Sequence, residues 1–128
     1  MLRGFIAMSY RKLDVWNKSI ELVIAVYQLT KSLPPEEKFG LASQIQRSAV
    51  SVSANIAEGY GRSTRGEYLQ FLSMANGSLK ETETLLTILV KVDLVSREQA
   101  FDAWKLAQTA GKMLTRLILS LKQPKPIK

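Results

Sequence analysis

Acidic side chains are the groups in this sequence that could act as general acids or bases. They form two close pairs, Glu36-Glu37 and Glu81 with Glu83. Glu36-Glu37 follows two prolines, and acids in the first turn of a helix are stabilised by the helix dipole, so this pair fits a helix start. Glu81 and Glu83 are two residues apart and therefore do not face each other on a helix. Neither pair predicts a catalytic site.

The sequence has no histidine and no cysteine. The chain therefore lacks the usual general base near neutral pH, the thiolate nucleophile, the disulfide and the commonest zinc ligands. The di-iron sites of helical bundles need Glu-x-x-His repeats, which are ruled out for the same reason. We expect a protein that is not an enzyme and that holds no metal or other cofactor.

Basic residues outnumber acidic ones, with 18 Lys and Arg against 11 Asp and Glu and a formal net charge of +7. An excess of this kind favours anionic partners such as nucleic acid, although it can also serve solubility alone. Arg62 and Arg65 lie in the glycine-rich run 59–66, beside the start of a predicted helix, where free backbone N–H groups also attract phosphate. The run is not a P-loop, because no strand precedes it and the Gly-Lys-Ser/Thr ending is absent. Phosphate contacts and solvated loop arginines both remain open.

A second basic group lies nearer the C-terminus. Lys105, Lys112 and Arg116 are seven and four residues apart, so they share one side of a helix, with Asp102 as the acid nearby. A solvated outer face is the usual meaning of such a row. The row becomes a binding surface if oligomerisation repeats it around a ring.

The segment 48–59 is rich in small residues and is flanked by a polar row at three- and four-residue spacing. This row is Gln44, Arg47, Ser51, Asn55 and Glu58. The next predicted helix offers Ser73, Asn76, Gly77, Lys80 and Glu83 at compatible spacing. The two rows form either a polar groove for a partner or a hydrogen-bonded seam between helices, with Arg47 paired to Glu81 or Glu83. Gly77 in mid-helix costs about 1 kcal/mol relative to alanine, which predicts close packing there.

Hydrophobic residues recur every three or four positions through four segments of the chain, and no segment alternates with period two. These segments are 13–33, 35–59, 64–90 and 96–122. Long helices with short connections pack antiparallel beside their neighbours. The sequence therefore predicts an all-α fold, an antiparallel up-and-down four-helix bundle.

The ends of these helices carry recognisable signals. Pro34-Pro35 ends the first helix and opens the second, and Gly59 is expected to end the second in a left-handed cap conformation. The third and fourth helices begin with capping-box spacing, Thr64 to Glu67 and Ser96 to Gln99.

We expect one domain: an N-terminal extension 1–12, the bundle 13–122 and a basic tail 123–128. No stretch reaches the roughly 20 apolar residues of a membrane helix, and the apolar N-terminus is too short for a signal peptide. These features predict a cytoplasmic protein.

The first and third helices carry more apolar residues than one bundle core requires, and the surplus predicts contact with another subunit. In the first helix one row is Leu13, Trp16, Ile20, Val23, Tyr27 and Thr30, and a second is Leu22, Val26, Leu29 and Leu33. The alternative is that one long helix is central and well buried. The predicted apolar stripe of the fourth helix is Ala100, Trp104, Ala107, Gly111, Leu114, Ile118 and Leu121.

Four segments carry a family resemblance. They are Leu-Asp-Val-Trp at 13–16, Gln-Ile-Gln-Arg-Ser-Ala-Val-Ser-Val at 44–52, Asn-Ile-Ala-Glu-Gly at 55–59 and Ala-Asn-Gly-Ser-Leu at 75–79. Together they resemble the four-helix-bundle proteins encoded in intervening sequences of bacterial 23S rRNA genes. The likeness covers about residues 13–121 and weakens in the fourth helix. The positions Arg47, Asn55, Glu58 and Gly59 match the family motif, and their role can be entirely structural.

The resemblance implies an antiparallel bundle, commonly assembled as a homopentamer with a central channel. It also implies kinship with the accessory variability proteins of diversity-generating retroelements, which are basic pentameric barrels that bind a reverse transcriptase and nucleic acid. It carries over no catalytic residue. A pentamer of this chain would have five charges of +7, a formal charge of +35, and would bind a polyanion with strong salt dependence.

These observations lead to one functional prediction and one alternative. We predict a non-enzymatic homopentamer that binds nucleic acid through phosphate contacts, with RNA, and rRNA in particular, favoured only by the resemblance. The candidate contact residues are Arg47, Arg62, Arg65, Lys105, Lys112 and Arg116. The alternative is a protein-interaction scaffold, or an accessory subunit of an enzyme such as a reverse transcriptase.

Overall fold

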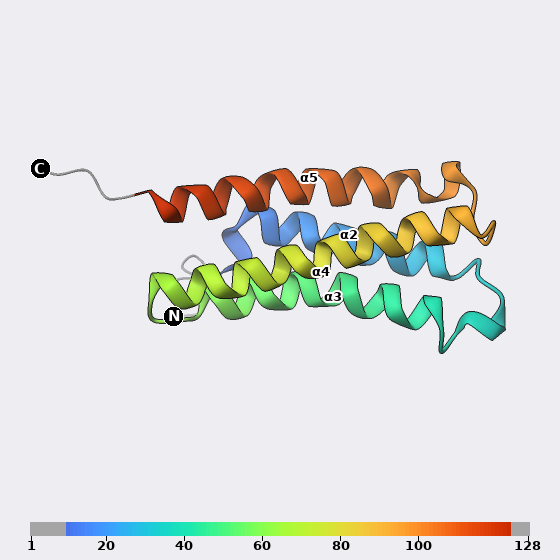
Figure 1. The fold of residues 1–128 in the computed structure, drawn as a ribbon, viewed down its shortest axis with the longest axis horizontal. Coiled ribbons are helices and arrows are strands. Elements are labelled where there is room, and N and C mark those ends of the chain that lie inside the picture. The colour runs from blue at the N-terminus through green and yellow to red at the C-terminus, as the bar shows by residue number, and fades with distance from the viewer. Residues whose placement is uncertain (1–9, 124–128) are drawn as a thin grey trace, which may run out of the picture.

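The computed structural model describes residues 10–123, and these form four long α-helices and two short 3-10 helices. The long helices are α2 (Asp14–Thr30), α3 (Leu41–Tyr60), α4 (Arg65–Lys91) and α5 (Arg97–Lys122), and the short ones are η1 (Tyr10–Lys12) and η2 (Pro35–Glu37). Each long helix runs antiparallel to the next, and α5 returns to pack against α2 (Figure 1). Residues 10–123 contain no strand. The predicted all-α four-helix bundle is confirmed.

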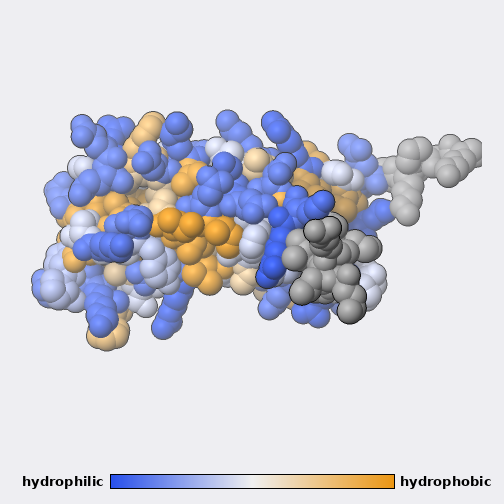
Figure 2. Space-filling view, turned by 180° about the vertical axis from the view of Figure 1, so that it is seen from behind, coloured by the Kyte–Doolittle hydropathy of each residue, from blue (hydrophilic) through white to orange (hydrophobic). Residues whose placement is uncertain are grey.

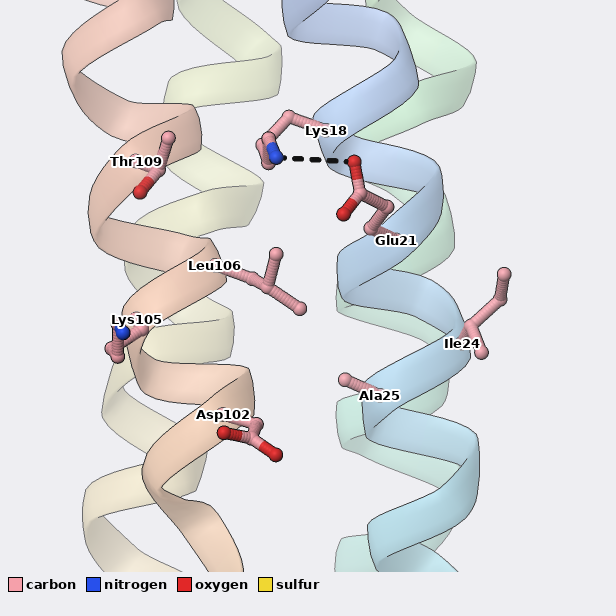
Figure 3. A pocket seen from close by; sticks show the side chains of 8 residues that line it. All are labelled: Lys18, Glu21, Ile24, Ala25, Asp102, Lys105, Leu106 and Thr109. Carbon is pink, nitrogen blue, oxygen red and sulfur yellow. Dashed lines mark ion pairs between the residues drawn. The ribbon is translucent and has the colours of Figure 1, made fainter.

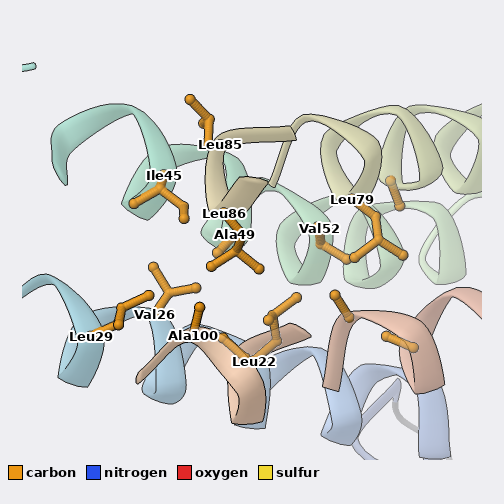
Figure 4. Packing of buried hydrophobic residues seen from close by; sticks show 14 of the residues in the cluster. Leu22, Val26, Leu29, Ile45, Ala49, Val52, Leu79, Leu85, Leu86 and Ala100 are labelled. Atoms are coloured by element: carbon orange, nitrogen blue, oxygen red, sulfur yellow. The ribbon is translucent and has the colours of Figure 1, made fainter. Parts of the chain in front are cut away.

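Aliphatic side chains from all four helices fill one core. Leu22 and Val26 of α2 meet Ile45 and Ala49 of α3 and Leu86 of α4 in the middle of the bundle (Figure 4). The contribution of α5 is different, because four of its five buried residues are alanines. These are Ala100, Ala103, Ala107 and Ala110, followed by Leu114. Small residues let α5 approach its neighbours closely and leave little room for a large ring in its buried row.

The two apolar rows of α2 have different environments. Leu22 and Val26 of the second row are completely buried. Trp16, Ile20 and Val23 of the first row are half-buried, and Tyr27 is exposed. The second row therefore supplies core residues, and the first row borders the core, with Trp16 and Val23 packed against it and Tyr27 exposed.

The connection between α2 and α3 corrects two predicted boundaries. Helix α2 ends at Thr30 rather than at residue 33, and Glu36-Glu37 lie in η2 rather than in the first turn of α3. Helix α3 begins at Leu41, because the preceding Gly40 has a non-helical backbone geometry with φ −103° and ψ −116°. The Glu37 carboxylate still contacts the start of this helix, because it accepts a hydrogen bond from the Leu41 N–H at 3.3 Å.

The starts of α4 and α5 follow the predicted capping residues. Ser96 Oγ accepts a hydrogen bond from the Gln99 N–H at 3.0 Å, and Gln99 Oε1 accepts one from the Ser96 N–H at 2.8 Å, so this capping box is confirmed. Thr64 Oγ1 accepts from the Glu67 N–H at 3.1 Å, but the Glu67 carboxylate accepts from the Thr64 hydroxyl instead of the Thr64 N–H. The first cap is therefore only half of a capping box.

The expected extension 1–12 and tail 123–128 lie almost entirely outside the described residues, which include only Tyr10–Lys12 and Gln123 of them. In the described part of the chain, none of the helices combines the length and the apolar character that crossing a bilayer requires.

Candidate nucleic-acid interface

The outer face of α5 carries three basic side chains. Lys105, Lys112 and Arg116 are all exposed, on the side of the helix opposite its buried alanines. None of the three forms an ion pair within residues 10–123. The Lys105 Nζ lies 5.4 Å from the centroid of the Phe101 ring one turn earlier. The prediction that these cations share one exposed side of the helix is confirmed.

The α3–α4 connection, which contains Arg62 and is followed by Arg65, lies at the end of the bundle where α5 also ends (Figure 1). Arg65 is the first residue of α4 and is exposed, so its charge stands beside free N–H groups of that helix. The Arg62 guanidinium carbon lies 4.4 Å from the centroid of the Phe71 ring, which holds this side chain against α4. Arg116 lies on the last two turns of α5, so it shares this end of the bundle with Arg62 and Arg65.

Arg47 does not belong to this group. It is exposed on α3, about 20 Å along the helix axis from the end at Tyr60. The predicted pairing of Arg47 with Glu81 or Glu83 is wrong, because Glu83 pairs with Lys80 at 3.5 Å and Glu81 forms no ion pair in the described part of the chain.

A polar seam lies between α3 and α4, but of the two predicted rows only Ser51 and Asn55 take part in it, and its α4 side is formed by Ser78 and Thr82. The Ser51 and Ser78 hydroxyls hydrogen-bond each other at 2.9 Å, and Asn55 Nδ2 donates to the Ser51 carbonyl at 2.9 Å and to Ser51 Oγ at 3.0 Å. Ser48 and Thr82 make a second cross-helix contact at 2.8 Å. The seam is therefore built from neutral hydroxyl and amide groups, whereas Arg47 and Glu58 remain exposed.

Gly59 has a structural role that differs from the predicted one. No glycine between residues 10 and 123 has a positive φ, so the expected left-handed cap is wrong. A Cβ at Gly59 would instead lie 2.8 Å from the Phe71 Cβ and 3.0 Å from a Tyr68 ring carbon. Glycine is required there because α3 and α4 touch.

Gly77 has the opposite environment. A Cβ at this position would meet no atom within 4 Å, and the residue is exposed on α4. The predicted close packing at Gly77 is wrong within the single chain.

A groove of about 570 Å³ runs between α2 and α5 (Figure 3). Its walls carry Lys18 and Glu21 from α2, which form an ion pair at 3.1 Å, and Asp102 and Lys105 from α5. Two cations and two acids balance in this groove, so it does not extend the basic surface. Lys105 lies on its edge and connects it to the outer face of α5.

A second pocket, of about 690 Å³, lies between α4, α5 and their connection, and it was not predicted from the sequence. Its lining residues are Leu86, Thr87, Val90, Lys91, Asp93, Arg97, Ala100, Phe101 and Trp104. Trp104 was expected in the apolar stripe of α5, but 40% of its surface is exposed. The run of alanines at 100, 103, 107 and 110 is the signal that could have corrected this, because it marks the buried row and puts Trp104 beside it.

Within the described part of the chain, the acidic residues do not gather into a metal site. Residues 10–123 contain no group of three or more possible acidic ligands.

The fold and these surfaces define a class of protein: a basic antiparallel helical bundle with exposed cations on one helix and at one end. A family model described as 23S rRNA-intervening sequence protein matches residues 11–116, and the chain belongs to this family. No curated protein matches the chain.

A solved structure supports the same relationship. The chain is similar to a protein of unknown function from the S23 ribosomal protein family of Bacteroides thetaiotaomicron, with 31% sequence identity and a TM-score of 0.75. The match covers 81% of this chain and 97% of that one. The fold of the whole bundle is therefore shared between the two proteins.

Proposed function

We propose that this protein assembles as a homopentamer and binds RNA, without catalysis, through phosphate contacts of exposed lysines and arginines. The observation that carries the proposal is the outer face of α5, where Lys105, Lys112 and Arg116 are exposed and form no ion pair with any other residue from 10 to 123. A charge without an acidic partner in its own chain is available to neutralise a phosphate. Arg62 and Arg65 add two such charges at the end of the bundle that Arg116 approaches.

Exposed apolar side chains support assembly. Ile24 and Tyr27 of α2 are 55% and 44% exposed, and Val50 of the neighbouring α3 is 42% exposed. Hydrophobic surface gathers near the middle of the face on which α2 lies (Figure 2). A patch of this kind on a helical bundle is suited to contact between copies. The number five comes from the family resemblance.

Assembly would strengthen RNA binding, because it brings several basic surfaces together. Five chains of +7 would carry a formal charge of +35, and each would repeat the basic face of α5. A polyanion that contacts several such faces releases many counterions, so its affinity depends steeply on salt.

The proposal is tested by fluorescence anisotropy with a labelled single-stranded RNA at several salt concentrations. We expect tight binding at low salt and a linear fall of log K with log salt concentration. The variant Lys105→Gln/Lys112→Gln/Arg116→Gln removes three phosphate contacts and should reduce the slope by about 2, because each contact on a single strand contributes about 0.7. The control Lys12→Gln/Lys31→Gln/Lys38→Gln removes the same charge from exposed positions outside α4 and α5 and should change the slope less.

Absence of RNA binding at low salt would contradict the proposal. Equal effects of the two triple variants would mean that net charge alone is responsible and that the face of α5 is not the contact surface. If the pure protein binds no RNA but retains the same protein partner after nuclease treatment, the scaffold alternative is favoured.

A further inference from the structure

The pocket between α4 and α5 contains two large aromatic rings that the core does not use. Phe101 is 55% exposed and Trp104 is 40% exposed, and they lie three residues apart on the same side of α5. The floor is apolar, with Leu86 and Val90 from α4 and Ala100 from α5. A flat ring that entered this pocket would find both an apolar floor and an aromatic face.

Positive charges surround the rings. Lys91 and Arg97 line the pocket from α4 and α5, and Lys105 lies 5.4 Å from the centroid of Phe101 on its other side. Asp93 is the acid that lines the pocket. Two cations against one acid in the lining, with Lys105 beside Phe101, favour an anionic ligand, and the aromatic rings favour a ligand that also has a flat, π-bearing group. Single-stranded nucleic acid has both, and its binding sites combine these two kinds of residue.

The pocket also borders the basic face of α5. Phe101 lines the pocket, Lys105 lies beside the Phe101 ring, and Lys112 and Arg116 follow on the same side of the helix as Lys105. From Phe101 to Arg116 this face extends about 22 Å along the axis. A strand with one base in the pocket could therefore place its following phosphates along the row of cations.

We propose that this pocket binds an unpaired base of single-stranded RNA, stacked on Trp104 and Phe101, while Arg97, Lys91 and Lys105 contact the adjacent phosphates. This inference rests on the proposed RNA binding and adds to it a preference for single strands. Duplex RNA keeps its bases stacked within the helix, so it can use the cations but not the aromatic pocket.

The chain has two tryptophans, Trp16 and Trp104, which makes the pocket accessible to a direct measurement. Trp16→Phe leaves Trp104 as the sole tryptophan. We expect a single-stranded oligouridylate of about ten nucleotides to quench Trp104 emission with the same midpoint as the anisotropy of the labelled RNA. Trp104→Phe leaves Trp16 on α2, away from the pocket, and should bind RNA without quenching. This variant also tests the assignment if Trp16→Phe does not fold, because the quenching seen in the natural sequence should disappear.

Two further comparisons sharpen the test. Trp104→Ala should weaken binding of the single strand about five-fold or more, because base stacking on an aromatic ring is usually worth at least that much. Binding of a blunt duplex of the same length should be almost unaffected by Trp104→Ala, and the duplex should not quench Trp104.

The possible failures are distinguishable. If RNA raises the anisotropy but leaves Trp104 emission unchanged, the pocket assignment is wrong and the proposed function survives. If no RNA binds at low salt, both proposals fail. If acrylamide cannot reach Trp104 in the RNA-free protein, a second copy of the chain covers the pocket, and the proposed base site is overturned.

Discussion

The hydroxyl groups of Ser48 on α3 and Thr82 on α4 hydrogen-bond each other at 2.8 Å. Both residues are buried between the two helices. Each hydroxyl also lies within hydrogen-bonding distance of a carbonyl in its own helix, that of Ile45 for Ser48 at 3.1 Å and that of Ser78 for Thr82 at 2.9 Å. The bond between the two hydroxyls forms only where Ser48 and Thr82 face each other, so this pair favours one register of α3 against α4.

The first prediction concerns this pair. Thr82→Val removes one hydroxyl and should lower the free energy of unfolding by about 1 kcal/mol, since Ser48 can still donate to the Ile45 carbonyl. Ser48→Ala should have a similar effect. The double variant should lose less than the sum of the two single losses, because they remove the same bond. Urea denaturation of the four proteins measures the difference; strictly additive losses would show that the two hydroxyls act independently.

The second prediction compares two glycines on neighbouring helices. Gly59→Ala places a Cβ 2.8 Å from that of Phe71, so α3 and α4 must separate, and we expect a loss of about 1–3 kcal/mol. Gly77→Ala is the matched control, because its Cβ meets no atom within 4 Å. Alanine is the better helix former, so this variant should gain about 1 kcal/mol.

Urea denaturation followed by circular dichroism measures both variants. A loss of stability in Gly77→Ala would mean that another chain covers α4 at this position. An unchanged stability in Gly59→Ala would contradict the contact with Phe71.

The third prediction concerns the start of α5. Ser96→Ala removes the side chain that accepts from the Gln99 N–H, and the free energy of unfolding should fall by about 1 kcal/mol. Ser120→Ala changes the same residue type at an exposed position near the end of α5, where no cap depends on it. Its free energy of unfolding should stay within about 0.5 kcal/mol of that of the natural sequence. Equal stabilities of the two variants would contradict the role of the capping box.

The fourth prediction concerns pH. Burial raises the pKa of the Tyr68 hydroxyl above its usual value, and the neighbouring Tyr60 raises it further. The unfolded chain ionises this group near pH 10, before the folded chain does, so folding stability should fall as the pH rises beyond about 10. Tyr68→Phe removes this contribution and should reduce the alkaline decline. Urea denaturation between about pH 9 and 11 measures this fall in the free energy of unfolding. An equal fall in the natural protein and in Tyr68→Phe would show that Tyr68 is not its cause.

The fold could be predicted because the relevant information is local. Periodic apolar residues define each helix, and Ser96 with Gln99 marks the start of α5 through bonds made within one turn. The boundary at Leu41 was missed because Gly40 breaks the helix, whereas Pro35 had suggested an earlier start. Ser19 was also missed: it is fully buried on the core side of α2, where its hydroxyl donates to the Trp16 carbonyl at 2.6 Å.

The surfaces could be predicted only in part. Periodicity finds an apolar face, but one helix can carry two neighbouring apolar rows, and only the packed neighbours decide which row is central. For this reason Trp104 was assigned to the core, although the alanines of α5 occupy that place. The prediction that Lys105 and Lys112 lie on the same side of α5 needs only their spacing in the sequence. The ion-pairing state of Arg47 depends on another helix, and the sequence could not determine it.

The last prediction concerns the exposed Ile24 on α2. If copies of the chain meet through this face, Ile24→Lys buries an unpaired charge at the contact and should shift the assembly toward a 14.3 kDa single chain in light scattering. Gln70→Lys adds the same charge to an exposed position of α4 and should leave the assembly intact. RNA affinity then distinguishes the effect of charge from the effect of assembly. Ile24→Lys makes each chain more positive, yet its RNA affinity should fall because the repeated α5 faces are lost. Tighter RNA binding by a monomeric Ile24→Lys protein would show that single chains bind RNA and that the ring is not needed.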